Sequence, residues 1–203
     1  IEQHPSSQIS PAVAVDAPDQ FGRSNIVVTW VGPTPLGEPC FYCPAIYARR
    51  FVLEPGNNPP SPAYIRDPNP SLGEGVKSDF IVNNQSIVRG PVNFANANPM
   101  VALSAEPTHR GRFIIAWNSL PPSGFSGDEV HGQYFDSDGR PMGCEFRMTN
   151  NASNTTNRSL AASARHTIAY ASNGNVALAY TKIGSEVWLS VIPAGTAEAL
   201  DAE

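Results

Sequence analysis

The sequence predicts an all-β protein built from four-stranded antiparallel meander repeats, about two and a half units that resemble propeller blades. Short runs of β-branched and aromatic residues recur between turns, the 203 residues include 20 Pro and 16 Gly, and charged residues make up only 15%. This composition is typical of many short strands joined by turns and long loops. We expect a single domain over residues 1–203, with units at about 8–84, 98–150 and 160–192 and a tail at 193–203.

The best-defined unit lies in the middle of the chain. Phe113 to Trp117 and Val130 to Phe135 are β-branched and aromatic, and Cys144 to Met148 alternates apolar and polar residues. The segment between the last two runs, Asp136 to Pro141, is rich in residues that tolerate turn geometry. These runs predict three neighbouring strands of one antiparallel sheet, with a hairpin turn between the second and the third.

The same order of strands recurs more weakly on both sides. First strands are predicted at 11–15, 99–103 and 166–170, second strands at 25–30, 112–117 and 175–180, third strands at 46–51, 130–135 and 187–192, and fourth strands at 78–83 and 144–149. The third unit has no fourth run. Trp30, Trp117 and Trp188 fall at strand positions, which predicts that they pack between units.

Unit two carries the residues of a recurring pattern: Pro99, Val101, Ala102, Gly111, Phe113 to Trp117, Val130, Gly132, Gln133, Phe135, Asp136, Gly139, Gly143, Glu145, Phe146 and Asn150. It resembles a repeat of large secreted bacterial proteins, including adhesin-like and RTX-type chains. The resemblance implies blades of a propeller or a related array, a secreted, periplasmic or cell-surface location, and a structural or binding role without catalysis. Cys144 and the two proline-rich loops depart from the pattern.

The number of units predicts assembly. A closed propeller needs about four to eight blades, and an open array exposes strand edges and apolar faces that must be covered. Subunits assembling side by side, units packed as a β-sandwich and docking on a larger assembly would each cover them, and we favour assembly. We expect contacts with protein partners or with a second copy through strand edges and the proline-rich loops at 31–44 and 52–75. The candidate interface residues are Tyr42, Tyr47, Tyr64 and Phe125, aromatic residues in or near loops.

A carbohydrate-binding, lectin-like module is the alternative, because exposed loop aromatics also stack on sugars. Asp136 and Asp138 are weak calcium candidates, since alternating carboxylates can chelate Ca²⁺. The rest of an EF-hand pattern is missing, and a hairpin turn with a left-handed Gly139 explains the segment better. We expect no other cofactor.

A glycan hydrolase is less favoured. Five carboxylates cluster in sequence and could supply an acid/base pair: Asp128, Glu129, Asp136, Asp138 and Glu145. His131, beside Glu129, could act as a general base, but no nucleophile elbow lies nearby. We expect the four histidines, His4, His109, His131 and His166, to be satisfied or exposed, and we predict that the protein is not an enzyme.

Charge and hydropathy restrict the partners further. The net charge is −5 and no Lys/Arg run occurs, which argues against a nucleic-acid partner. No apolar run approaches the ~20 residues that span a bilayer as a helix. Four triplets fit the N-glycosylation pattern, at Asn84, Asn151, Asn154 and Asn157; in a eukaryotic protein the last three would mark an exposed loop.

Three cysteines allow at most one disulfide. Either Cys144 pairs with Cys40 or Cys43, or Cys40 and Cys43 pair locally. The CxxC spacing also occurs in redox and zinc sites, but Pro39 and Pro44 flank it and no second ligand pair completes a zinc site. A structural disulfide is the favoured interpretation in an oxidising compartment.

Overall fold

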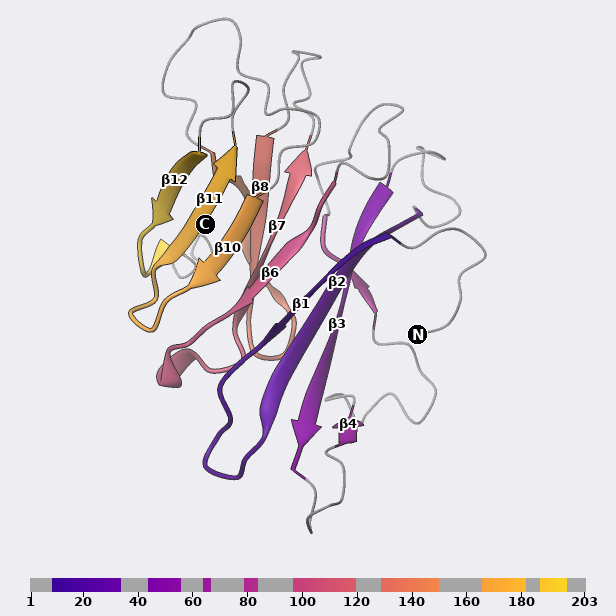
Figure 1. Cartoon of the computed structure of the whole chain (residues 1–203), viewed down its shortest axis with the longest axis vertical. Helices are drawn as coiled ribbons and strands as arrows, with labels where there is room; N and C mark the ends of the chain where they lie inside the picture. The colour runs from indigo at the N-terminus through magenta and orange to yellow at the C-terminus, as the bar shows by residue number, and fades with distance from the viewer. Residues whose placement is uncertain are drawn as a thin grey trace, which may run out of the picture.

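The computed structural model describes residues 9–33, 44–55, 64–66, 79–83, 97–119, 129–149, 166–181 and 187–196. These residues form three antiparallel sheets, and a single 3₁₀ turn, η3 (Pro107–His109), joins two of the described strands. The all-β, blade-like architecture is therefore confirmed (Figure 1). Within the described part of the chain, no helix has the length and hydropathy needed to cross a membrane.

The middle sheet is a four-stranded meander and matches the predicted central unit. Its strands are β6 (Met100–Leu103), β7 (Phe113–Ser119), β8 (Glu129–Phe135) and β9 (Pro141–Arg147), hydrogen-bonded in that order. In register, Ile115 of β7 lies between Val101 of β6 and Gln133 of β8. The fourth strand begins three residues before the predicted start at Cys144, because it continues directly from the hairpin turn.

The first sheet has five strands. They are β1 (Ile9–Val15), β2 (Ser24–Pro33), β3 (Pro44–Glu54), β4 (Tyr64–Arg66) and β5 (Phe80–Ile81). The predicted fourth strand at 78–83 is present as the two-residue β5, which pairs with β3 at Tyr47 and Ala48. β4 was not predicted; it lies within the proline-rich loop and pairs with the other end of β3. Both short strands occupy the edge of β3 opposite β2.

The last sheet contains β10 (His166–Tyr170), β11 (Val176–Thr181) and β12 (Val187–Ile192) in that order. The three strands described in this sheet correspond to the three runs predicted for the third unit. Among the described strands, none pairs with the outer edge of β12. The last sheet therefore ends in a strand whose outward backbone groups have no described partner strand.

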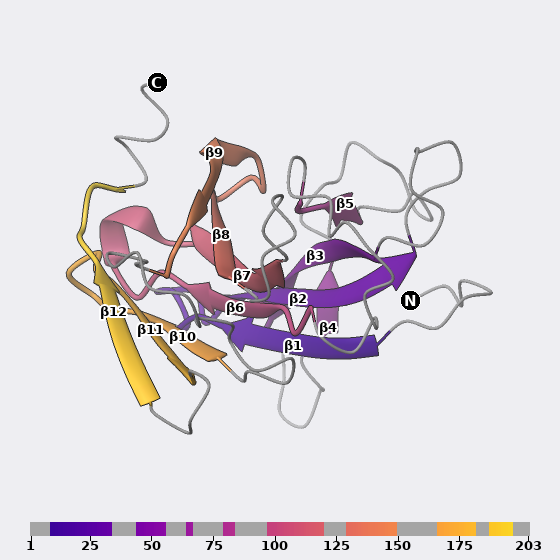
Figure 2. The same cartoon turned by 90° about the horizontal axis from the view of Figure 1, so that it is seen from above.

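The middle sheet lies between the other two, and each of its faces belongs to a separate hydrophobic core (Figure 2). Phe113, Ile115 and Trp117 pack against the first sheet. Ile114 and Ala116, on the opposite face of the same strand, pack against the last sheet. A strand that is buried on both faces has a continuous run of apolar residues in its sequence. This explains the run of apolar residues in β7. The first strands of the sheets, β1, β6 and β10, lie side by side at the centre of the array.

Aromatic rings join the sheets at both junctions. Phe113 and Phe135 of the middle sheet stack with ring centroids 4.8 Å apart, and Phe80 of β5 lies 5.4 Å from Phe135. At the other junction, Tyr134 meets Tyr170 of β10 edge-on at 6.3 Å. Pairs in these geometries each contribute about 0.5–1.5 kcal/mol beyond the area they bury. The two junctions are therefore packed cores.

The prediction that the three tryptophans pack between units is right for Trp117, which is buried in the core shared by the first and middle sheets. Trp30 is also buried, but it stacks on Tyr47 and is not part of either core between sheets, and Trp188 is 44% exposed. Trp188 lies on β12, the edge strand of the last sheet. Because no described fourth strand flanks β12, the ring of Trp188 is not enclosed as that of Trp117 is.

Candidate functional site

The three sheets are stacked in the same orientation, so that equivalent faces of successive sheets point in the same direction along the array. We call the side that looks toward the preceding sheet the backward face and the opposite side the forward face. In the middle sheet, Val101 and Leu103 of β6 lie on the backward face and Ala102 lies on the forward face. In the first sheet, the small residues Ala12 and Ala14 of β1 form part of the forward face and pack against the middle sheet. Both junctions thus join a forward face to a backward face.

The strand register identifies which residues of the last sheet are equivalent to buried residues elsewhere. Cross-strand pairing places Tyr47, His131 and Trp188 at the same position of the three third strands, opposite Trp30, Trp117 and Tyr180. The preceding residues, on the forward face, are Ile46, Val130 and Val187. Ile46 and Val130 are fully buried under the following sheet. Val187 has no following sheet among the described residues.

The forward face of the last sheet is consequently exposed. Val187, Leu189 and Val191 of β12 are 75%, 66% and 58% exposed. They line up beside Thr181, Ala179 and Ala177 of β11. We call these six residues the forward end surface. None of them carries a charge, so the surface is apolar where a soluble sheet normally carries polar residues.

The backward face of the first sheet forms the opposite end of the array. Val13 and Val15 of β1 are 63% and 56% exposed, although Val101 and Leu103, their counterparts in β6, are buried against the first sheet. Their neighbours on β2 are Val28 and Ile26, which are half-buried. We call these four residues, Val13, Val15, Ile26 and Val28, the backward end surface.

Tyr47 adjoins the backward end surface, and it is the predicted interface residue whose side chain the structure describes. It lies on β3 and stacks on Trp30 with ring centroids 6.0 Å apart. Burial, with a smaller contribution from Asp79, raises the pKa of the Tyr47 hydroxyl. Tyr64 lies in β4, while Tyr42 and Phe125 fall outside the described residues. Tyr47 therefore lies on a strand, within the run 46–51 that the sequence predicts as one.

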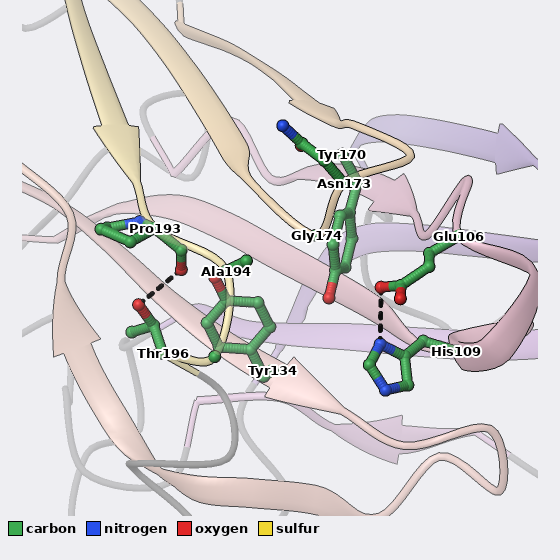
Figure 3. A pocket seen from close by; sticks show the side chains of 10 residues that line it. Glu106, His109, Tyr134, Tyr170, Asn173, Gly174, Pro193, Ala194 and Thr196 are labelled. Carbon is green, nitrogen blue, oxygen red and sulfur yellow. Dashed lines mark hydrogen bonds and ion pairs between the residues drawn. The ribbon is translucent and has the colours of Figure 1, made fainter.

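A separate small cleft lies between the η3 turn and the turns of the last sheet (Figure 3). Its volume is about 250 Å³, below the roughly 300–1,000 Å³ of ordinary ligand pockets. Glu106 accepts hydrogen bonds from the Thr108 hydroxyl at 2.6 Å and lies 2.7 Å from Nδ1 of His109. These contacts, Thr108 first, hold the pKa of Glu106 below its ordinary value. Tyr134 lines the cleft but is stacked on Phe146 and almost completely buried, so its ring is not available to stack on a sugar.

Glu106, the acidic residue that lines this cleft, was not among the site residues predicted from the sequence. The sequence feature that could have indicated this contact is the spacing of Glu106 and His109, which are three residues apart with Pro107 between them. A tight turn brings the two side chains together. His109 is satisfied by Glu106, in agreement with the general expectation for the histidines. The geometry gives the pair a role in ordering the turn between β6 and β7.

Asp136 and Asp138 form the predicted hairpin turn. One oxygen of Asp136 accepts hydrogen bonds from the backbone N–H groups of Asp138 and Arg140, both at 2.8 Å. Gly139 has φ +82°, the left-handed conformation that the turn requires. Within the described part of the chain, no group of three or more His, Cys, Asp or Glu side chains is arranged to hold a metal. The turn interpretation is therefore confirmed, and the calcium alternative stays untested.

The remaining sequence candidates are dispersed. His131 lies on β8 opposite Trp117, and Glu145 lies half-buried on β9. Cys144 is exposed on β9 as a free thiol, so the cross-link from Cys144 to Cys40 or Cys43 is not formed in this structure. Cys40 and Cys43 fall outside the described residues, and their local pairing stays a prediction. Asp128 and His4 are also outside them.

Comparison of the chain with protein-family models, with curated proteins and with solved structures finds no match. The resemblance of unit two to secreted bacterial repeats accordingly stays a prediction from the sequence.

Proposed function

We propose that this chain is a non-catalytic, extracellular structural or interaction protein that assembles with itself or with a larger complex. The observation that carries the proposal is the pair of apolar end surfaces. Val187, Leu189 and Val191 are each more than half exposed at one end of the array, and Val13 and Val15 are more than half exposed at the other. Contiguous exposed apolar residues mark interaction surfaces on soluble proteins.

Burial of these residues would supply a driving force for assembly. Complete burial of a Val or Leu side chain that is otherwise exposed stabilises by about 1.5–3 kcal/mol. A tenfold change in affinity corresponds to about 1.4 kcal/mol. Burial of five such residues, even when each is only partly covered, would therefore strengthen association by more than tenfold. Part of this gain is offset by the loss of translational and rotational freedom on association.

The outer edge of β12 and the aromatic pair beside the backward end surface support the same conclusion. A strand edge without a partner strand is a ready template for pairing with another chain. Tyr47 and Trp30 place a stacked aromatic pair next to Ile26 and Val28, and aromatic residues are enriched in protein interfaces. The sequence predicts contacts through loops and strand edges. We propose that the faces of the two end sheets take part in these contacts as well.

Light scattering on the 203-residue chain tests the proposal. We expect a mass above the 21.7 kDa of one chain, with a fraction of assembled protein that increases with concentration. The melting temperature should increase with concentration as well, because association stabilises the folded state by mass action. A mass of one chain and a constant melting temperature over a hundredfold concentration range would refute self-assembly.

A further inference from the structure

We propose that the forward end surface of one copy binds the backward end surface of a second copy, so that two copies close a ring of six sheets. The inference rests on the proposed function, because it specifies how the chain assembles. Each copy contributes three sheets. A ring of six blades falls within the range of about four to eight that closed propellers use.

The internal junctions provide the template for this contact. At each of them a forward face covers the backward face of the following sheet. The register makes Val187 the counterpart of the buried Ile46 and Val130. In the same way, Val13 is the counterpart of the buried Val101. The exposed residues at the two ends are therefore those that a further sheet of the same kind covers elsewhere in the molecule.

Side-chain size is also complementary between the two end surfaces. At the first internal junction, small forward residues such as Ala14 and Ala48 meet large backward residues such as Phe113 and Phe135. The forward end surface repeats this pattern with Ala177 and Ala179 on β11, and the backward end surface has Val and Ile throughout. Large residues opposite small ones allow sheets to interdigitate, which two identical forward faces would not achieve.

Charge does not oppose the contact. The forward end surface has no charged residue. Arg49, the charged residue that shares the backward side of β3 with Tyr47, lies 3.6 Å from Asp79 and 5.3 Å above the ring of Phe51. Its charge is therefore balanced within the same sheet, and a second copy would meet no unpaired ion there.

A head-to-tail contact has a consequence that a symmetric contact lacks. Two copies joined head to tail form two junctions, and each junction uses the forward surface of one copy and the backward surface of the other. A substitution on one surface therefore affects both junctions when every copy carries it. Mixing two variants that are altered on opposite surfaces restores one junction without any substitution.

The experiment uses Leu189→Lys on the forward end surface and Val13→Glu on the backward end surface. Both side chains are mostly exposed, so each variant should fold, which circular dichroism checks. The matched control is Phe21→Lys, because Phe21 is 63% exposed in the turn between β1 and β2 and outside both end surfaces. Val187→Lys replaces Leu189→Lys if the latter fails to fold. Sedimentation velocity measures the mass of each variant and of equimolar mixtures.

We expect the unaltered chain and the Phe21→Lys control to sediment at twice the mass of one chain. Each end-surface variant alone should dissociate with a Kd raised at least about tenfold, since a charge replaces a buried apolar contact. The mixture of the two variants should recover two-copy complexes, because one junction is intact and the other places Lys opposite a Glu-bearing surface.

Four results would overturn the proposal. A single-chain mass at all concentrations would overturn both it and self-assembly. Two-copy complexes that tolerate both end-surface variants would leave assembly intact but transfer the contact to loops or strand edges. Disruption by Leu189→Lys with no recovery in the mixture would indicate contact between identical surfaces. Complexes larger than two copies would exclude closure at six sheets.

Discussion

Replacing Phe113 by Ala tests the stacking of the sheets directly. Phe113 is fully buried on the backward face of β7, 4.8 Å from the ring of Phe135 and 6.4 Å from that of Phe80 in the first sheet. Truncation removes one member of this three-ring cluster and leaves a cavity between two sheets. Phe→Ala substitutions in cores cost about 3–5 kcal/mol, and the packing on both sides indicates a value in the upper half of that range.

Urea denaturation monitored by circular dichroism measures this loss. With a slope of about 2 kcal/mol per molar urea, a loss of about 4 kcal/mol lowers the unfolding midpoint by about 2 M. Phe21→Ala is the matched control, because the same side chain is removed from an exposed turn. It loses the contact of the Arg23 guanidinium 5.0 Å above its ring and should change stability by less than about 1 kcal/mol. If the two variants show equal midpoints, the first and middle sheets do not share the core described above.

Three further changes test the turns. Gly139→Val forces a β-branched residue to φ +82° and should cost about 1–3 kcal/mol by thermal or urea unfolding, whereas Asn at the same position should cost less. Asp16→Ala removes the acceptor that holds the backbone and side-chain N–H groups of Asn25, each at 2.7 Å, and should cost about 1–3 kcal/mol; Asp138→Ala in an exposed turn should be close to neutral. Because the folded-state pKa of Glu106 is lowered, its contribution to stability is complete above the ordinary value of 4.5 and is lost as the pH falls through the lower folded value. The melting temperatures of the unaltered chain and Glu106→Gln should therefore differ at neutral pH and converge in acid; a difference that persists in acid would contradict this assignment.

Local patterns were sufficient to predict most of the strands. The run from Phe113 to Trp117 and the turn around Gly139 specify a strand and a hairpin without long-range information. β4 was missed because three residues, Tyr64 to Arg66, are too few to show a period and proline surrounds them. Its pairing depends on the length of β3, which extends to Glu54.

The orientation of the sheets could not be predicted from the sequence. Alternation identifies a buried face only when the other face is polar, and Ile114 and Ile115 on opposite sides of β7 are equally apolar. The error at Trp188 has the same origin, because its position in the strand is equivalent to that of His131, but no fourth strand is described beside β12 as β9 lies beside β8. Burial there depends on neighbouring elements that the local sequence does not specify.

The outer edge of β12, which pairs with none of the described strands, also makes this segment prone to ordered aggregation if it is exposed. Val187–Ile192, with the sequence VWLSVI, has high β-propensity, no charge and no proline, which is the signature of segments that form amyloid-like stacks. Natural edge strands are usually blunted by lysine, proline or a bulge, and this hexapeptide has none of the three within its regular pairing to β11. Whatever covers β12 would therefore also act as a gatekeeper against fibril growth.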